Sequence, residues 1–384
     1  MTTTTQKLKK PFLVLFLIVA TELIGFGLII PILPQLALQF NVGGFWMGLL
    51  LCSYSLAQFI ASPVLGQLSD KIGRKPVLVA SKLGTALSYL LLANASTYPL
   101  FLLARLLDGF TGGNIAVARA YVSDITTPEN RTKGMAIIGM SFGVGFVLGP
   151  ALGGFLFGMY DTHFIPCLIA GGLSLLATLF TIILLEEPKK LKSKQSNKVS
   201  NLKLLTQKNI GIILITQFIF MCCFAAFETT FSVFMHTSYN FTAQDNSQLF
   251  LYLGLLALFI QGGIVRKSFK NLRLATILGL LLTAVTFIGL SFTPKLWVLY
   301  AALIVLSFGI ALLNTHLPAL LSQQSQNTNN GQVMGLYESV GSISRIIGPL
   351  VIYTSFFTKL STGYTIAGAL LGFSILVIYN YKTD

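Results

Sequence analysis

The chain has 384 residues, of which 54% are apolar and only 10% are charged, and its mean hydropathy is +0.77. Soluble domains usually carry about 25% charged residues, so this composition argues against a soluble protein and predicts an all-α, polytopic membrane protein. The net charge of +14 raises the question of a nucleic-acid partner, which the placement of the charges answers.

Apolar stretches long enough to cross a bilayer recur along the whole chain. A spanning helix needs about 20 mostly apolar residues. The first stretch follows three lysines, but it is too long for a signal peptide and lacks a small-residue cleavage pattern, so we expect it to remain. The twelve predicted spans are 11–34, 44–67, 76–94, 99–124, 134–158, 164–185, 210–236, 247–265, 274–293, 296–321, 331–355 and 361–381.

The basic residues are distributed unevenly between the two sides of the predicted membrane. With both termini in the cytoplasm, twenty of the 26 lysines and arginines fall on the cytoplasmic side, and only Lys295 and Lys359 fall outside. This is the pattern of the positive-inside rule, so the net charge requires no polyanionic partner and we expect no nucleic-acid binding.

A lysine-rich stretch at 186–209 divides the spans into two groups of six. It predicts an N-terminal six-helix bundle at 1–185, a cytoplasmic linker at 186–209 and a C-terminal six-helix bundle at 210–384. A degenerate repeat supports this division, because a Gly-Pro pair lies deep in the fifth span at 149–150 and again in the eleventh at 348–349.

The first span, "VATELIGFGLIIPILP", contains one carboxylate, Glu22. Counted from Pro11, Glu22 lies about 16 Å into a core of ~30 Å, close to its middle. Burial favours the neutral form of a carboxyl group, so Glu22 can exchange protons near neutral pH. The alternative is a neutral, hydrogen-bonded structural acid, but a charge at this depth is a functional candidate by default.

The fourth span carries Arg105 and Asp108 one turn apart, with Arg119 further along. Intramembrane charges are rare, although a paired arginine and aspartate can also be purely structural.

The turn "GQLSDKIGRKPV" at 66–77 is either an orienting hydrophilic loop or a charge latch, with Asp70 and Arg74 four residues apart. The fifth span reads "GVGFVLGPALGG", and its small residues also suit ordinary helix packing.

These motifs resemble those of the major facilitator superfamily. The turn fills the signature GxLxDxxGRKxx with Gly66, Leu68, Asp70, Gly73, Arg74 and Lys75. The resemblance implies two six-helix bundles that work by rocking alternating access. It also implies a latch in which Asp70 faces the Gly331 region and Arg74 reaches Asp124.

The resemblance extends to the drug/proton antiporter branch of that family. Its antiporter motif GxxxGPxxGG is matched by Gly145, Gly149, Pro150, Gly153 and Gly154. The first span is similar to that of tetracycline/proton antiporters, which generally carry aspartate where this chain has Glu22. "FAAFETTFSVF" is similar to the seventh helix of quinolone exporters and contains Glu228. Arg105 and Gly109 match the family's second motif, in which the arginine is thought to influence proton transfer, while Asp108 departs from it.

The remaining candidates are weaker. Glu338 and Arg345 lie seven residues apart on one face of the eleventh span and are interpreted as an ion pair within the bundle, with a cavity role as the alternative. His316 is a candidate proton shuttle or a hydrogen-bonded packing residue. The residues chosen by helix position as substrate contacts are Phe26, Tyr54, Gln58, Asn114, Gln217, Phe224, Phe227 and Phe231.

The sequence thus predicts a proton-coupled transporter that exports amphipathic, cationic or zwitterionic drugs by antiport. A dedicated exporter of a metabolite, siderophore or lipid, and a proton-coupled nutrient importer, remain open; an enzyme or a receptor is poorly supported. We expect no cofactor or metal besides protons, a monomer, and a bacterial inner membrane as suggested by the similar families. The four cysteines lie within spans and show no metal-ligand spacing.

Overall fold

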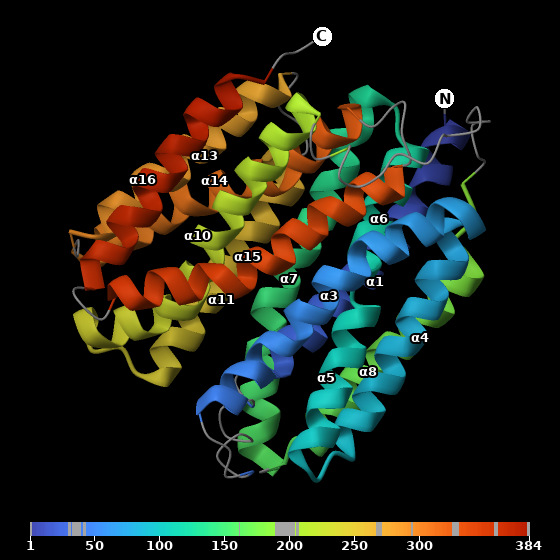
Figure 1. Cartoon of the computed structure of the whole chain (residues 1–384), viewed down its shortest axis with the longest axis horizontal. Coiled ribbons are helices and arrows are strands. Elements are labelled where there is room, and N and C mark those ends of the chain that lie inside the picture. Colours follow the sequence, from blue (N-terminus) through green and yellow to red (C-terminus); the bar gives the residue numbers. More distant parts are fainter. Residues whose placement is uncertain are drawn as a thin grey trace. The chain divides into compact units, whose positions relative to one another are not determined.

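The computed structural model consists of helices joined by turns (Figure 1). It describes residues 2–29, 32, 40, 44–160, 162–188, 204, 207–265, 271–292, 295–324, 330–356 and 360–381. No strand occurs among these residues, so the predicted all-α class is confirmed. Most of the predicted linker lies outside the described residues, and the boundaries at 186 and 210 stay a prediction.

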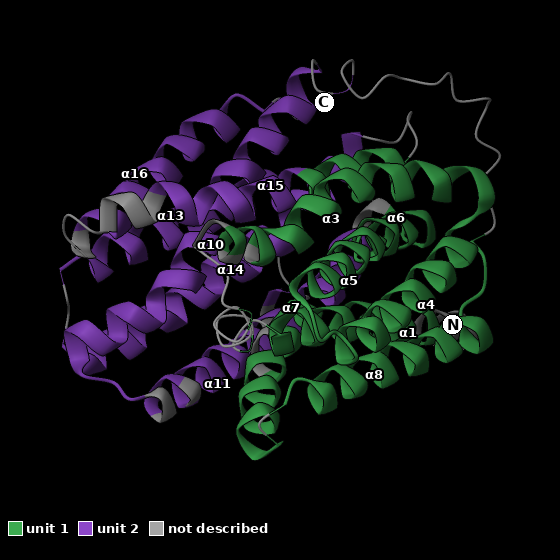
Figure 2. Ribbon diagram, turned by 60° about the horizontal axis from the view of Figure 1, so that its bottom comes forward, with its two compact units in different colours: residues 1–127, 140–195, 329–339 green, residues 128–139, 196–328, 340–384 purple. Residues whose placement is uncertain are grey.

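The chain divides into two compact units (Figure 2). Unit 1 comprises residues 1–127, 140–195 and 329–339. Within it α4 packs against α8 and α5, α1 packs against α8, and α3 packs against α5 and α6. Its helices are α1 (Thr2–Ile29), α3 (Gly44–Ile72), α4 (Arg74–Ala93), α5 (Tyr98–Thr111), α6 (Asn114–Ile125), α8 (Phe164–Leu184) and the later part of α7 (Pro128–Tyr160).

Unit 2 comprises residues 128–139, 196–328 and 340–384. Within it α13 packs against α14 and α16, and α16 also packs against α10. Its helices are α10 (Lys208–Tyr239), α11 (Ala243–Phe259), the π-helical turn η1 (Ile260–Val265), α13 (Leu272–Leu290), α14 (Leu296–Gln324), α16 (Leu360–Tyr379) and most of α15 (Asn330–Phe356).

Helices of the described residues lie at each of the twelve predicted places. Ten helices in the described part of the chain are long and apolar enough to cross a membrane. The other two segments are more polar or shorter: α11 has a short apolar stretch, Gln248–Gly263, and α15 carries Glu338 and Arg345. A helix buried among others tolerates such residues because its neighbours, rather than lipid, surround them.

Two local predictions need correction. The segment 66–72 is not a loop, because α3 continues to Ile72 and only Gly73 separates it from α4. Gly73 has a φ of 108°, which a side chain would disfavour, and this allows the sharp turn. The fourth span is not one helix either, since it is divided into α5 and α6 at Gly112 and Gly113.

Apolar packing holds the helices of unit 1 together around a buried cluster. Tyr89 and Leu92 from α4 meet Phe101 and Ala104 from α5 and Cys167 from α8 there. Between membrane helices such packing stabilises through van der Waals contacts, because lipid tails are as apolar as the side chains themselves. The polar residues described next are therefore positioned by tightly packed helices rather than by loops.

Candidate functional site

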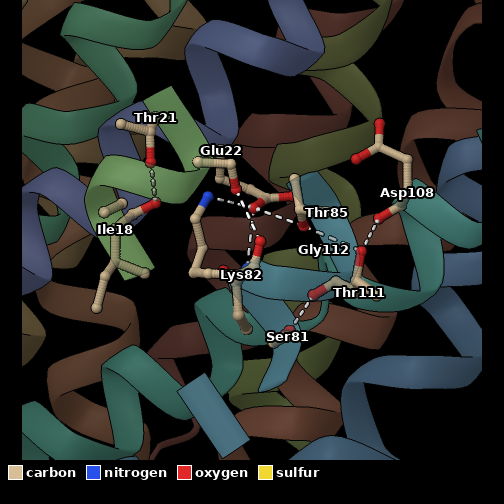
Figure 3. Close-up of polar contacts among 12 residues, drawn as sticks. Ile18, Thr21, Glu22, Ser81, Lys82, Thr85, Asp108, Thr111 and Gly112 are labelled. Atoms are coloured by element: carbon tan, nitrogen blue, oxygen red, sulfur yellow. Dashed lines mark hydrogen bonds and ion pairs between the residues drawn. The ribbon is translucent and has the colours of Figure 1, made fainter. Parts of the chain in front are cut away.

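The carboxylate of Glu22 on α1 is buried in unit 1 and receives four hydrogen-bond donors (Figure 3). Its Oε2 atom accepts from Lys82 Nζ at 3.0 Å, Asn114 Nδ2 at 2.9 Å and Thr85 Oγ1 at 3.4 Å. Its Oε1 atom accepts from the Tyr54 hydroxyl at 3.3 Å. Such a set gives both carboxylate oxygens a hydrogen-bond partner, since every neighbour donates, and one of them, Lys82, forms an ion pair with Glu22.

Polar side chains of α3 extend this network. The amide of Gln58 donates to the Tyr54 hydroxyl at 3.3 Å and to the carbonyl of Gly112 at 2.9 Å. A Cβ on Gly112 would overlap the Tyr54 hydroxyl and lie 2.9 Å from Glu22 Oε1. The interruption between α5 and α6 therefore brings backbone close to Glu22, where only glycine leaves enough room.

A second buried ion pair lies beside this network. Arg105 Nη1 donates to Asp108 Oδ2 at 3.0 Å, and both residues lie on α5. The guanidinium also lies 5.0 Å from the centre of the Tyr54 ring and 5.9 Å from that of Phe26, within the range of cation–π attraction. Seven predicted site residues of unit 1 are thus brought close to one another: Glu22, Phe26, Tyr54, Gln58, Arg105, Asp108 and Asn114, on α1, α3, α5 and α6.

The predicted antiporter motif on α7 packs directly against α1. A Cβ on Gly149 would lie 2.8 Å from Gly27 Cα and 2.9 Å from the carbonyl oxygen of Ile24. Gly145 and Gly153 approach the backbone of Leu23 and Leu28 in the same way, whereas a Cβ on Gly154 would meet nothing within 4 Å. Three glycines of the motif therefore fix α7 against the turns of α1 that follow Glu22.

The predicted latch residues also meet within unit 1. The carboxylate of Asp70 accepts from the backbone N–H groups of Gly331 at 3.0 Å and Gln332 at 2.9 Å, at the N-terminus of α15. Arg74 pairs with Asp70 at 2.6 Å and with Asp124 at 2.8 Å. A carboxylate at a helix N-terminus is favoured by the unpaired N–H groups and the helix dipole.

Close backbone contact and a second carboxylate complete the latch. A Cβ on Gly66 would overlap the backbone of Gly331, so glycine is required for this approach. Glu187, which follows α8, accepts from the backbone N–H groups of Arg74 at 2.6 Å and Lys75 at 2.8 Å. Glu187 thereby caps the N-terminus of α4, and it was not among the predicted latch residues.

Glu338 and Arg345, the predicted ion pair of α15, each contact a further residue in the structure, and their pairing with each other stays a prediction. Glu338 is paired with Arg119 from α6 at 2.6 Å, and both side chains are buried in unit 1. Arg345 donates to Ser342 at 3.1 Å and acts electrostatically on Glu228 in unit 2.

The candidates in unit 2 contact aromatic rings and backbone groups among the residues that the structure describes. Phe227 and Phe231 are buried and pack with each other at 4.5 Å between ring centres, and Phe227 also packs with Phe287. Phe224 packs with Phe220, and Gln217 lies close to Gly341. His316 is buried, and its Nδ1 atom lies 2.8 Å from the carbonyl oxygen of Leu312, one turn earlier in α14. These contacts favour packing roles for the two buried phenylalanines and the histidine.

Lys82 is the residue of this site that the sequence analysis missed. It lies inside the predicted span 76–94, so an unexplained charge in an apolar helix was the available signal. Thr85, one turn further along α4, has no such signal. Their connection with Glu22 depends on the packing of helices 60 residues apart in the sequence.

Comparisons with known proteins agree with this architecture. The sequence profile of the Major Facilitator Superfamily matches residues 15–349. The tetracycline resistance protein, class H, of Pasteurella multocida is 30% identical, over 97% of this chain and 96% of that protein. Multidrug resistance protein 2 of Bacillus subtilis (strain 168) is 28% identical, over 98% and 96%. The crystal structure of the human organic anion transporter MFSD10 (TETRAN) has the same fold, with a TM-score of 0.85 at 23% identity over 96% of this chain and 99% of that chain.

Proposed function

The chain belongs to the major facilitator superfamily, and from this premise we propose that it is a proton-coupled secondary transporter that exports amphipathic, cationic or zwitterionic compounds in exchange for protons. The fold of this superfamily supports alternating access, in which two helical bundles rock around a binding site at the membrane midplane. Proton coupling, the direction of transport and the substrate class are the parts that this proposal adds.

The packing of the antiporter motif on the Glu22 helix carries the proposal. Gly149 and Gly153 of α7 contact α1 within the two turns that follow Glu22. A movement of either helix therefore displaces the other, because no side chain separates their backbones. Protonation of an acid on α1 can in this way be linked to the conformation of a motif found in antiporters.

Competition between protons and a cationic substrate for a buried carboxylate explains how the two are exchanged. An ionised carboxylate at this depth needs a positive partner, and either a proton or the cationic group of a substrate can provide one. Glu22 in unit 1 and Glu228 in unit 2 are the two acids assigned to this role, and Arg105 with Asp108 sets the electrostatic environment beside Glu22. Two acids allow one to carry protons while the other binds a cation.

The relatives support an exporter of drug-like compounds. Two of the similar proteins are named for resistance to tetracycline and to multiple drugs. The latch around Asp70 and Arg74 would control the rate of the conformational change without forming the substrate site. We place the chain in a bacterial inner membrane as a monomer with both termini in the cytoplasm, with protons as its only coupling ion.

Proton movement in liposomes tests the proposed function. Purified protein is reconstituted with an internal pH indicator, and a panel of cationic and zwitterionic drugs is added on one side under an imposed pH gradient. Antiport predicts proton flux that starts with the drug and is absent from the Glu22→Gln, Glu228→Gln variant. Undiminished drug-driven flux in that variant would contradict the proposal.

The same assay separates the other transport classes. If a substrate and protons move in the same direction, the chain is a symporter, and a nutrient importer becomes the better interpretation. If folded protein responds to no member of the panel, a dedicated carrier of a metabolite, siderophore or lipid replaces the drug exporter. Insertion of the variant is checked by its monodisperse elution in detergent.

A further inference from the structure

The ammonium group of Lys82 is a buried charge with little support. Its side chain is 0% exposed, and among the residues that the structure describes its Nζ atom has one oxygen acceptor, Glu22 Oε2 at 3.0 Å. An ammonium has three N–H groups to donate, so two of them lack an acceptor here. The backbone of Lys82 is fixed by Ser174 of α8, which donates to its carbonyl oxygen at 3.0 Å.

Glu22, in contrast, does not depend on Lys82 for its hydrogen bonds. Asn114, Thr85 and Tyr54 donate to its carboxylate from three other positions on α6, α4 and α3. These three groups are neutral, so they hold the carboxylate in place but leave its charge unbalanced. Lys82 therefore contributes the positive charge that balances Glu22, and another cation could take over that contribution.

The charged groups around this site sum to zero. Glu22 of α1 is balanced by Lys82 of α4, and Arg105 is balanced by Asp108 on α5. The other titratable groups that face them are Tyr54 of α3, Tyr89 of α4 and Cys167 of α8, which are neutral when protonated. A cation that enters this buried cluster adds an unbalanced charge, which is strongly unfavourable in a medium of low dielectric constant.

Of the two basic side chains that the structure describes in this cluster, Lys82 is the one that can remove that excess charge. Arginine keeps its proton under all conditions relevant to proteins, so Arg105 cannot respond. Lysine can lose its proton when it is buried, and the neutral amine no longer repels a cation bound to Glu22. The substrate and the Lys82 proton would then occupy the site alternately, with the total charge constant.

We propose that Lys82 carries the exchanged proton and acts as the chain's own substitute for the cationic group of the substrate at Glu22. When that group pairs with the carboxylate, the Lys82 ammonium becomes an amine and one proton leaves for solution. When a proton returns to the amine, the ammonium pairs with Glu22 again and the substrate is released. This inference rests on the proposed antiport and identifies both its coupling residue and the charge of its substrate.

A binding experiment on the purified full-length chain tests this assignment. The probe is tetraphenylphosphonium, whose permanent charge carries no proton of its own, and a pH indicator follows proton release in weakly buffered detergent solution. The native chain should release about one proton for each cation bound, so its affinity should rise about tenfold per pH unit while Lys82 is protonated.

Two substitutions of Lys82 distinguish a proton carrier from a fixed ion pair. Lys82→Gln should still bind the probe, without proton release and with an affinity that no longer changes with pH. Lys82→Arg preserves the ion pair and hence the fold, but its charge is permanent, so binding should weaken at least tenfold. Lys133→Gln, at an exposed lysine of unit 2, serves as the matched control and should behave like the native chain.

Each contrary result overturns the assignment. Proton release by Lys82→Gln equal to that of the native chain, or normal binding by Lys82→Arg, would show that Lys82 is only structural. Absence of probe binding by the folded native chain, or proton uptake with benzoate in its place, would show that the site takes no cation. If Lys82→Gln releases protons while Glu22→Gln does not, the antiport stands and its proton is carried by Glu22.

Discussion

Lys82 and Glu22 form an ion pair of 3.0 Å in which both side chains are buried. Replacing one partner of a buried ion pair is strongly destabilising, because the remaining charge is left without a counterion. We therefore expect Glu22→Gln and Lys82→Gln each to lower the free energy of unfolding by as much as about 3–5 kcal/mol. Thermal unfolding in detergent measures these losses of stability. The double variant should lose less stability than the sum of the two single variants, whereas strict additivity would show that the two charges do not interact.

The antiporter motif offers a matched pair of glycines for a second prediction. Gly149→Ala would place a methyl group 2.8 Å from Gly27 Cα, whereas a methyl group at Gly154 would meet nothing within 4 Å. The first substitution should lower stability by about 1–3 kcal/mol and reduce transport, because α7 must move away from α1. The second should leave both nearly unchanged. Equal transport by the two variants would contradict a role for this helix contact.

The latch yields a prediction about rate rather than affinity. Asp70→Asn replaces the carboxylate that accepts hydrogen bonds from the N–H groups of Gly331 and Gln332. A hydrogen bond to a charged group contributes about 1.5–3 kcal/mol. Transport rates should fall by about tenfold or more while the apparent affinity for substrate changes little. Initial rates over a range of substrate concentrations separate the two. Asp245→Asn, the same exchange outside the latch, is the control, and a comparable rate loss there would remove the specificity of the effect.

Acid should loosen the first turn of α11. Thr242 donates to Asp245 from its hydroxyl at 2.6 Å and from its backbone N–H at 2.8 Å, and these bonds lower the pKa of Asp245 from its ordinary value of 3.8. Because the folded pKa is lowered, the cap is fully formed above pH 3.8 and is lost as the pH falls below that value. The protection factors of the first α11 amides against hydrogen exchange, which correct for the intrinsic pH dependence of exchange, should fall over this range, and Asp245→Asn should remove that change.

The helical architecture was predictable because membrane spans impose a strong pattern. Each span needs about 20 mostly apolar residues, and the twelve predicted stretches correspond to observed helices, ten of which meet this requirement in the described part of the chain. Helix interruptions carry no such pattern. Gly112 and Gly113 divide α5 from α6, but glycine is common inside unbroken membrane helices as well, so the sequence alone did not indicate the break.

Single charged residues were easier to predict than their partners. Glu22 was recognisable from its depth in an apolar span, and the partners of Asp70 followed from a family resemblance. Arg119 and Glu338 were both recognised as buried charges, yet their pairing joins residues more than 200 positions apart. Helical spacing instead suggested Arg345 for Glu338, because residues seven apart share a face and no tertiary information was present.

Gradient-driven uptake into inside-out membrane vesicles tests the central claim most directly. An acidic interior should drive accumulation of a cationic dye such as ethidium by the native chain, and collapse of the pH gradient with nigericin should release the dye. The account predicts that Glu22→Gln, present at the native level in the same vesicles, shows no accumulation that depends on the gradient. Accumulation by that variant equal to the native chain would contradict proton coupling through Glu22.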